Sequence, residues 1–227
     1  MIRGRIIFVP SRTRPSLATM SFLASALDSL FPACREGTFS CPCGAVQCEL
    51  RVPFSSYGLI DQTNALCQCN DCLAFCQACP NGQAVIHNHA THMVNFYKSD
   101  VTITKGHDQI RAVKLRDDTP LIRLYCAACG TPLGAQVVHA PVVLLYHDLL
   151  TQGPIYLPTL VLGRKWAPPA ARPYATAVHR YYNFGLFFLL KVVGRVLLGF
   201  LWGNKDGPGL LEASAYDTVP VGLGSIG

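Results

Sequence analysis

The sequence predicts a mainly β fold of antiparallel strands with bound metal. Short apolar runs, several alternating with polar residues, follow one another from about residue 37 to residue 168. Gly, Pro, Asn and Asp separate these runs, and helical periodicity is weak between them. The 11 cysteines form closely spaced groups, which is typical of metal sites rather than of a disulfide framework.

Composition excludes several classes of protein. With 50% hydrophobic and 14% charged residues, the chain is not disordered, and it has enough apolar residues for a packed core and an apolar surface. The net charge of +6 is spread along the chain without a Lys/Arg-rich run, so no nucleic-acid partner is predicted. The apolar run at residues 6–9 is too short for a secretory signal. We therefore expect an intracellular, reducing compartment.

Residues 1–36 are predicted to be an N-terminal leader. Four arginines and four serines occur before the first acidic residue, Asp28, and this composition is typical of organelle transit peptides. A mitochondrial location is therefore one prediction. The alternatives are a disordered basic tail on a cytoplasmic protein, or upstream sequence before a true start at Met20.

The β domain, residues 37–168, begins with a clear half-buried strand. Its inward positions are apolar and its outward positions polar: Val46, Cys48, Leu50 and Val52 on one face, and Gln47, Glu49 and Arg51 on the other. Cys48 is therefore predicted to be a core residue rather than a ligand. Further strands are expected in MVNFYK, DVTITKG, IRAVKLR, LIRLY, PVVLLYH and IYLPTLVLG.

Two cysteine pairs far apart in the sequence predict a structural zinc site. They are Cys41 and Cys43 in CPCG, and Cys126 and Cys129 in CAACGTPLG. A pair followed by Gly is typical of a zinc knuckle, because the tight turn lets backbone amides approach the sulfurs. Each knuckle supplies two of the four ligands that a structural zinc requires. A shared zinc would tie the first strand to a late one.

A second cluster, CQCNDCLAFCQACPNG, contains five cysteines. Cys67, Cys69 and Cys72 could hold a zinc ion with an open fourth position, as in catalytic sites. Alternatively Cys76 or Cys79 completes a closed structural site, or the segment binds no second metal.

Taken together, these motifs resemble the glutathione-dependent formaldehyde-activating enzyme family, which includes centromere protein V. The resemblance covers roughly residues 37–168 and rests on C-x-C-G-A-V, then C-x-C-x2-C, then C-x2-C-G-T-P-L. It implies a β-tent zinc-binding fold and two Zn²⁺ ions. The structural zinc would be bound by Cys41, Cys43, Cys126 and Cys129, and the working zinc by Cys67, Cys69 and Cys72.

The implied activity is that of a carbon–sulfur lyase. A small thiol such as glutathione would add to formaldehyde and give the S-hydroxymethyl adduct. The sequence departs from the family pattern after Cys72, where Cys76 and Cys79 are additional. If either reached the second zinc, the open position would close. The alternative function is a non-catalytic, zinc-stabilised module of a membrane or a larger assembly.

The alternative function, a non-catalytic module, depends on the segment after the β domain. A Pro-rich linker is expected at 169–180, a hydrophobic helix at 181–203 and a flexible tail at 204–227. Residues 184–202 are long enough to cross most of a bilayer, but Lys191 and Arg195 interrupt them. The free-energy cost of placing these two cations in the bilayer nearly cancels the gain from inserting the apolar residues. A membrane-spanning helix is therefore only marginally favourable. The helix could instead lie on a membrane, pack on a partner or pack on the β domain.

Two further features receive weaker functional interpretations. His87, His89 and His92 in HNHATHM could bind metal, but a role at the surface or in a loop is favoured. Asp71, between two cysteines of the second cluster, is favoured as a turn or supporting residue over a general base.

Overall fold

A computed structural model describes residues 34–53, 63–137, 140–154, 156, 158–163, 179–180, 190, 193–194 and 197. The chain divides into two units, 1–33 and 34–227, and every described residue belongs to the second. The part of the predicted leader before residue 34 therefore lies outside the described residues. Within the described ranges the predicted mainly β, antiparallel fold is confirmed.

As far as the structure describes the chain, the smaller sheet has four strands in the order β11–β1–β2–β6, all antiparallel. Its strands are β1 (Cys34–Ser40), β2 (Gln47–Pro53), β6 (Val101–Lys105) and β11 (Leu150–Gln152). The predicted alternation is present, because Cys48, Leu50 and Val52 are buried while Glu49 and Arg51 are exposed. Cys48 therefore lies in the core, as the pattern predicted.

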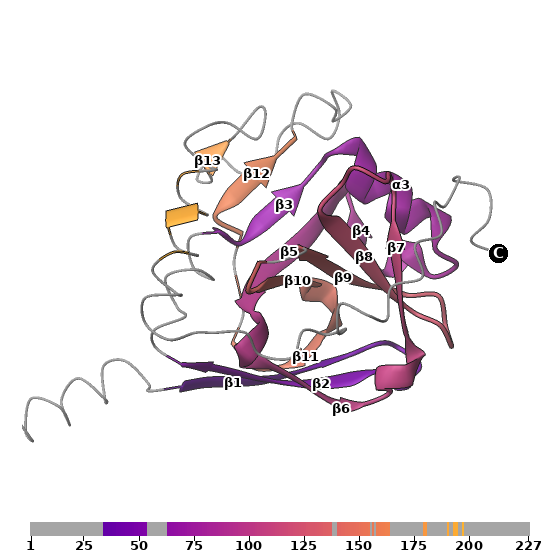
Figure 1. Ribbon diagram of the computed structural model, residues 1–227, viewed down its shortest axis with the longest axis vertical. Helices are drawn as coiled ribbons and strands as arrows, with labels where there is room; N and C mark the ends of the chain where they lie inside the picture. Colours follow the sequence, from indigo (N-terminus) through magenta and orange to yellow (C-terminus); the bar gives the residue numbers. More distant parts are fainter. Residues whose placement is uncertain are drawn as a thin grey trace, which may run out of the picture. The chain divides into compact units, whose positions relative to one another are not determined.

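The larger sheet has nine strands among the described residues, in the order β13–β12–β3–β5–β10–β9–β8–β7, with β4 beside β5 (Figure 1). Its strands are β3 (Ala65–Cys67), β4 (Ile86–His87), β5 (Ala90–Tyr97), β7 (Ile110–Lys114), β8 (Leu121–Cys126), β9 (Pro132–Val137), β10 (Val142–Tyr146), β12 (Leu160–Leu162) and β13 (His179–Arg180). Pairing is antiparallel except that β12 runs parallel to both β3 and β13.

One apolar core joins the two sheets. Phe39 and Leu50 from the smaller sheet belong to the same cluster of buried side chains as Phe96, Leu124 and Leu145 from the larger one. Each of these side chains stabilises the fold by about 1.5–3 kcal/mol through its removal from water. The core therefore fixes the strand ends at which the cysteines lie.

The helix α3 (Asn70–Ala78) was not predicted. Its buried residues Cys72, Phe75 and Cys76 are three and four positions apart, so they share one face that packs into the core. The helix ends before Cys79, which is extended and precedes Pro80. In the described part of the chain, short 3₁₀ turns connect other elements at Gly82–Val85, Lys98–Asp100, His107–Gln109 and His147–Leu149.

Little of the predicted C-terminal part falls within the described residues. In 181–203 these are Leu190, Val193, Gly194 and Leu197, which are helical, and the three apolar side chains are 57%, 43% and 56% exposed. The rest of that predicted helix, most of the linker and the tail lie outside. In the described part of the chain, no helix has both the length and the apolar character needed to cross a membrane.

Candidate metal centres

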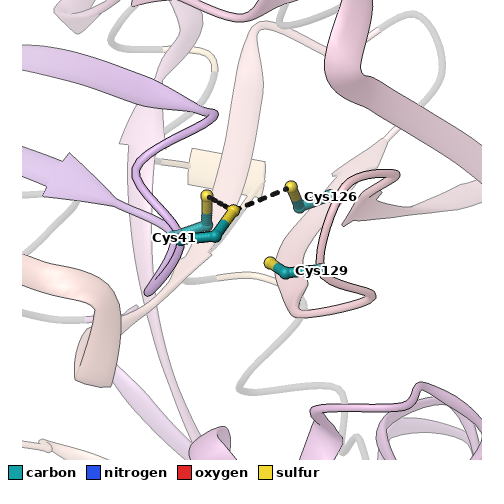
Figure 2. A group of neighbouring side chains, drawn as sticks. Cys41, Cys126 and Cys129 are labelled. Atoms are coloured by element: carbon teal, nitrogen blue, oxygen red, sulfur yellow. Dashed lines mark hydrogen bonds between the residues drawn. The ribbon is translucent and has the colours of Figure 1, made fainter.

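The first cysteine group brings the two sheets together. Cys41 and Cys43 lie in the turn between β1 and β2, and Cys126 and Cys129 lie where β8 turns towards β9. The four Sγ atoms all lie within 4.8 Å of one another. Cys43 Sγ is 3.3 Å from Cys41 Sγ and 3.8 Å from Cys126 Sγ (Figure 2). We call this group the four-cysteine centre.

Tight turns hold these sulfurs in place. Gly44 and Gly130 each follow a cysteine pair and adopt left-handed backbone, with φ of 69° and 66°. The backbone N–H of Val46 donates to Cys41 Sγ at 3.2 Å. Although burial opposes its ionisation, hydrogen bonding with Thr131 lowers the pKa of Cys129 to about 7.

The separation of the sulfurs fits a tetrahedral metal ion. Four sulfurs at the usual zinc–sulfur distance of about 2.3 Å lie about 3.8 Å from one another. The sulfur–sulfur distances of 3.3 and 3.8 Å are close to this value. The four-cysteine centre could therefore hold a metal ion as the sequence predicted.

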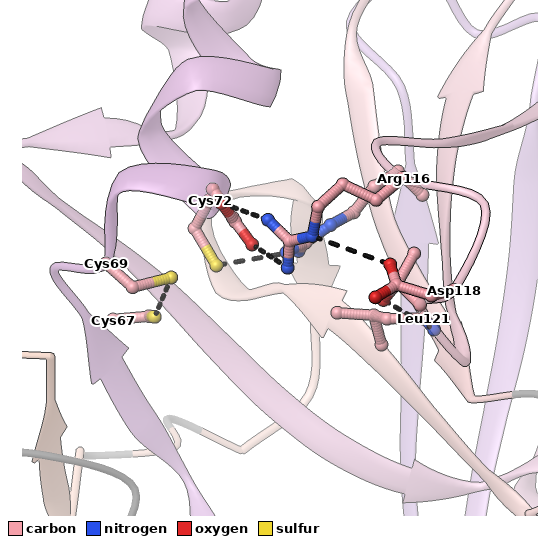
Figure 3. Close-up of polar contacts among 9 residues, drawn as sticks. Cys67, Cys69, Cys72, Arg116, Asp118 and Leu121 are labelled. Carbon is pink, nitrogen blue, oxygen red and sulfur yellow. Dashed lines mark hydrogen bonds and ion pairs between the residues drawn. The ribbon is translucent and has the colours of Figure 1, made fainter. Parts of the chain in front are cut away.

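The second group consists of Cys67, Cys69 and Cys72, which we call the three-cysteine centre. Cys67 is the last residue of β3, Cys69 occupies the position immediately before α3, and Cys72 lies in the first turn of that helix. Their Sγ atoms also lie within 4.8 Å of one another, and the Cys67 and Cys69 sulfurs are 3.3 Å apart (Figure 3). All three side chains are buried, with 1%, 8% and 3% of their surface exposed.

A buried arginine supplies positive charge to this centre. Arg123, in β8, is 3% exposed, and its Nη1 donates to Cys72 Sγ at 3.5 Å. Hydrogen bonds from the Cys67 and Cys69 thiols, together with the charge of Arg123, lower the pKa of Cys72 well below its usual range, against the effect of burial. The centre therefore favours a thiolate at Cys72, and a thiolate is the form that binds a metal.

The two additional cysteines of the cluster do not join the three-cysteine centre. Cys76 Sγ donates instead to the hydroxyl of Tyr146 at 3.2 Å. Burial raises the pKa of both Cys76 and Cys79 to about 12, so they remain protonated thiols near neutral pH. Within the described ranges, this second group is thus made of three cysteines.

Comparison with known proteins places the β domain in a family. Residues 35–154 match the model of DUF6151, described as a family of unknown function. The chain belongs to the DUF6151 family. Its DUF6151 region contains both centres, with their cysteines at positions 41, 43, 67, 69, 72, 126 and 129.

A solved structure with limited similarity to this DUF6151 protein illustrates the comparison with known structures. It is the crystal structure of a Rhodobacter sphaeroides protein determined as a structural genomics target. The two are 16% identical, and the match covers 50% of this chain and 87% of the other, with a TM-score of 0.36. None of the curated proteins matches the chain at a significant level.

The position of Cys76 and Cys79 leads to a prediction about metal content. The double variant Cys76→Ala/Cys79→Ala should retain the same number of metal ions per chain as the wild type. Its free energy of unfolding should fall by about 2–4 kcal/mol, because two buried sulfurs and one hydrogen bond are lost. Elemental analysis of the purified protein and thermal unfolding would measure the two quantities. Loss of a metal ion would show that one of these cysteines is a ligand.

An ion pair that the sequence did not reveal ties the loop between β7 and β8 to α3. Arg116 binds Asp71 through two contacts, Nη1–Oδ1 at 3.0 Å and Nη2–Oδ2 at 2.8 Å (Figure 3). The side chains are 57% and 41% exposed, so solvent screens the pair and it contributes little to stability. Asp71, the neighbour of Cys72 in the chain, therefore pairs with an arginine of this loop, and its interpretation as a supporting residue stays a prediction.

The histidines of HNHATHM do not form a metal group in the described residues. His89 is exposed in the left-handed turn between β4 and β5, and His87 pairs with Asp148 at 2.8 Å. His92 lies in β5, where its Nε2 is 2.7 Å from Asn64 Oδ1 and its ring stacks on His147. Burial lowers the pKa of His92 to about 4, so it is neutral at pH 7.

Proposed function

We propose that the three-cysteine centre binds a catalytic zinc ion, and that the protein adds a thiol of the glutathione type to formaldehyde. The observation that carries this proposal is the ligand count. Three sulfurs gather, while Cys76 pairs with Tyr146 and Cys79 stays apart, so among the described residues no fourth cysteine closes the centre. Three protein ligands and one exchangeable position are the usual arrangement of catalytic zinc.

The resemblance to the glutathione-dependent formaldehyde-activating family supports the choice of reaction. Both cysteine groups of that family's pattern have counterparts here, together with the CGTPL segment that begins at Cys129. The proposed β-tent fold and the assignment of the metals as zinc also rest on this resemblance. The mitochondrial location stays a separate prediction, based on the composition of the leader.

The proposed reaction is a reversible addition. The thiol sulfur forms a bond to the formaldehyde carbon, the C=O π bond opens, and the thiol proton ends on the oxygen, giving the S-hydroxymethyl adduct. Zinc, when bound, lowers the pKa of a coordinated thiol or polarises an aldehyde oxygen. Cys67, Cys69 and Cys72 would hold the ion, and the four-cysteine centre would hold a structural zinc that joins the sheets.

An NMR assay of S-hydroxymethylglutathione formation tests the proposal. Wild type should exceed the uncatalysed rate, and Cys69→Ser should return to that rate because one ligand of the working zinc is lost. Cys79→Ala is the matched control, since it removes a buried cysteine of the same cluster outside the centre. It should keep the wild-type rate. A wild-type rate equal to the uncatalysed background would refute the proposed enzymatic activity.

The burial of the three sulfurs favours a second candidate, a non-catalytic zinc-stabilised module. At most 8% of the surface of each of these three cysteines is exposed, and such closed surroundings are also typical of a structural metal site. In this case the segment 184–202 would dock the protein on a membrane or in a larger assembly. The same assay separates the candidates, because the module predicts background rates for wild type and Cys69→Ser alike, with metal still bound to the wild type.

A further inference from the structure

Arg123 is a buried cation that pairs with sulfur. Its side chain is 3% exposed, and among the described residues its guanidinium donates a hydrogen bond to Cys72 Sγ at 3.5 Å. Among the described residues no carboxylate forms an ion pair with it. Because an unpaired charge is costly inside a protein, a buried arginine implies a neighbouring anion. The cysteines of the three-cysteine centre are the groups in position to supply it.

The guanidinium is also held in place from a second side. It lies 5.9 Å from the centre of the Phe75 ring, one turn along α3 from Cys72. Strand β8 supplies Arg123, while α3 supplies both Cys72 and Phe75. A charge fixed between two packed elements needs little reorganisation when a ligand binds, so its effect on charged ligands is large.

The charges of this centre show what such an arginine changes. A divalent metal with three thiolates has a net charge of −1, which a neutral fourth ligand keeps and a thiolate ligand changes to −2. With Arg123 included, these totals become 0 and −1. In a buried centre the additional negative charge is poorly solvated, so a fixed cation favours the anionic ligand and has little effect on a neutral one.

We propose that Arg123 makes the three-cysteine centre selective for an anionic sulfur ligand, a thiolate, over neutral ligands of similar size. This inference rests on the proposed function, in which the fourth position is exchangeable, and it names the class of ligand that enters there. On binding, the S–H bond of the thiol breaks, a metal–sulfur bond forms, and the proton passes to the buffer.

Ligand binding to the cobalt-loaded protein tests this role without measuring activity. Cobalt(II) in both centres is titrated at one pH with 2-mercaptoethanol and separately with imidazole, and the change in visible absorption gives both dissociation constants. In Arg123→Met the preference for the thiol over imidazole should fall about 30- to 100-fold. This is the effect expected for one charge at an assumed distance of about 6–8 Å from the bound ligand, with an effective dielectric constant of about 20. Arg111→Met, which removes an exposed arginine of the same hairpin, should change it by less than about threefold.

Two further variants keep the test valid if Arg123→Met does not fold. Arg123→Lys retains the charge and should keep most of the preference, whereas Arg123→Gln should lose it. The cobalt bands of the four-cysteine centre, which has no open position, report whether each variant is folded. An unchanged preference in Arg123→Met or Arg123→Gln overturns the role of Arg123 alone. A wild-type spectrum that does not respond to the thiol overturns the proposed function, and this inference with it.

Discussion

Cys43→Ser should destabilise the protein more than Cys48→Ala, although Cys43 is exposed and Cys48 is buried. Burial alone predicts the opposite order, because a buried sulfur loses packing when it is removed. Metal binding reverses the order, since Cys43 Sγ is one of the four sulfurs that gather in the four-cysteine centre and Cys48 Sγ is not. The comparison therefore tests whether that centre binds a structural metal.

The expected size of the effect follows from the position of the centre. Structural zinc contributes about 10–16 kcal/mol of apparent binding free energy in small zinc domains. Losing one of four ligands should cost about 3–5 kcal/mol, a large fraction of the stability of an ordinary domain. The cost here includes the contact between sheets, because Cys43 follows β1 and Cys126 ends β8, 83 residues further along the chain. Cys48→Ala should cost about 1 kcal/mol.

Metal content and thermal unfolding would measure both variants. Cys43→Ser should lose about one metal ion per chain, and its Tm should fall by about 6–20 °C, whereas Cys48→Ala should keep its metal and lose about 2–4 °C. A strong chelator should lower the Tm of the wild type towards that of Cys43→Ser. If the serine variant keeps its metal and its Tm, the four sulfurs are neighbours without a metal function.

The sequence was most informative about the cysteines whose position in a local pattern indicates either burial or metal binding. The alternation in β2 placed Cys48 in the core and separated it from the ligand cysteines, and the structure agrees. Cysteine pairs followed by Gly likewise indicated turns that present two sulfurs, and these turns are present at Gly44 and Gly130. Both features depend on local geometry, which neighbouring residues determine.

The helix α3 was missed because its pattern depends on the cysteines. Its buried face is formed by Cys72, Phe75 and Cys76, which fit helical periodicity only when cysteine counts as an apolar residue. In a cluster of five cysteines, each one can be interpreted either as a ligand or as a core residue. The fold is needed to distinguish the two roles. It places Cys72 beside Cys67 and Cys69, whereas it places Cys76 beside Tyr146.

Arg123 was missed for a different reason. In LIRLY an alternating pattern puts Ile122 and Leu124 inside and Arg123 outside. Strand β8 lies between β7 and β9, and Ile122, Arg123 and Leu124 are all buried. One face of the strand meets the apolar core, while the arginine meets α3 and Cys72. No local signal predicts this contact, because α3 lies about 50 residues earlier in the chain.

Gly163→Ala should weaken metal binding at the three-cysteine centre and leave the four-cysteine centre intact. Gly163 follows β12, whose Leu162 carbonyl accepts a hydrogen bond from the Gln68 backbone at 2.9 Å. A Cβ at Gly163 would lie 2.8 Å from the Cys69 nitrogen and 3.0 Å from its Cα and Cβ. The ligand segment would therefore have to shift, and metal sites tolerate only about 0.2 Å in their ligand distances.

Backbone strain contributes to this change, and a matched glycine separates it from the steric contact. Gly163 has a φ of 68°, which costs an alanine about 1–3 kcal/mol. Gly44 has a φ of 69°, but a Cβ there would meet only the Gln47 side-chain nitrogen, at 3.9 Å. Gly44→Ala therefore carries the same strain without touching Cys69, and it should not alter the three-cysteine centre.

Stepwise removal of metal by a colorimetric chelator would distinguish the two centres. In Gly163→Ala one metal ion per chain should be released at a chelator concentration at least tenfold lower than in the wild type, while the second ion is unaffected. In Gly44→Ala the ion of the three-cysteine centre should be released as in the wild type. If Gly163→Ala and wild type release both ions identically, contact with Gly163 does not set the position of Cys69. A selective loss would show that β12, which comes late in the chain, positions a ligand of the proposed catalytic metal.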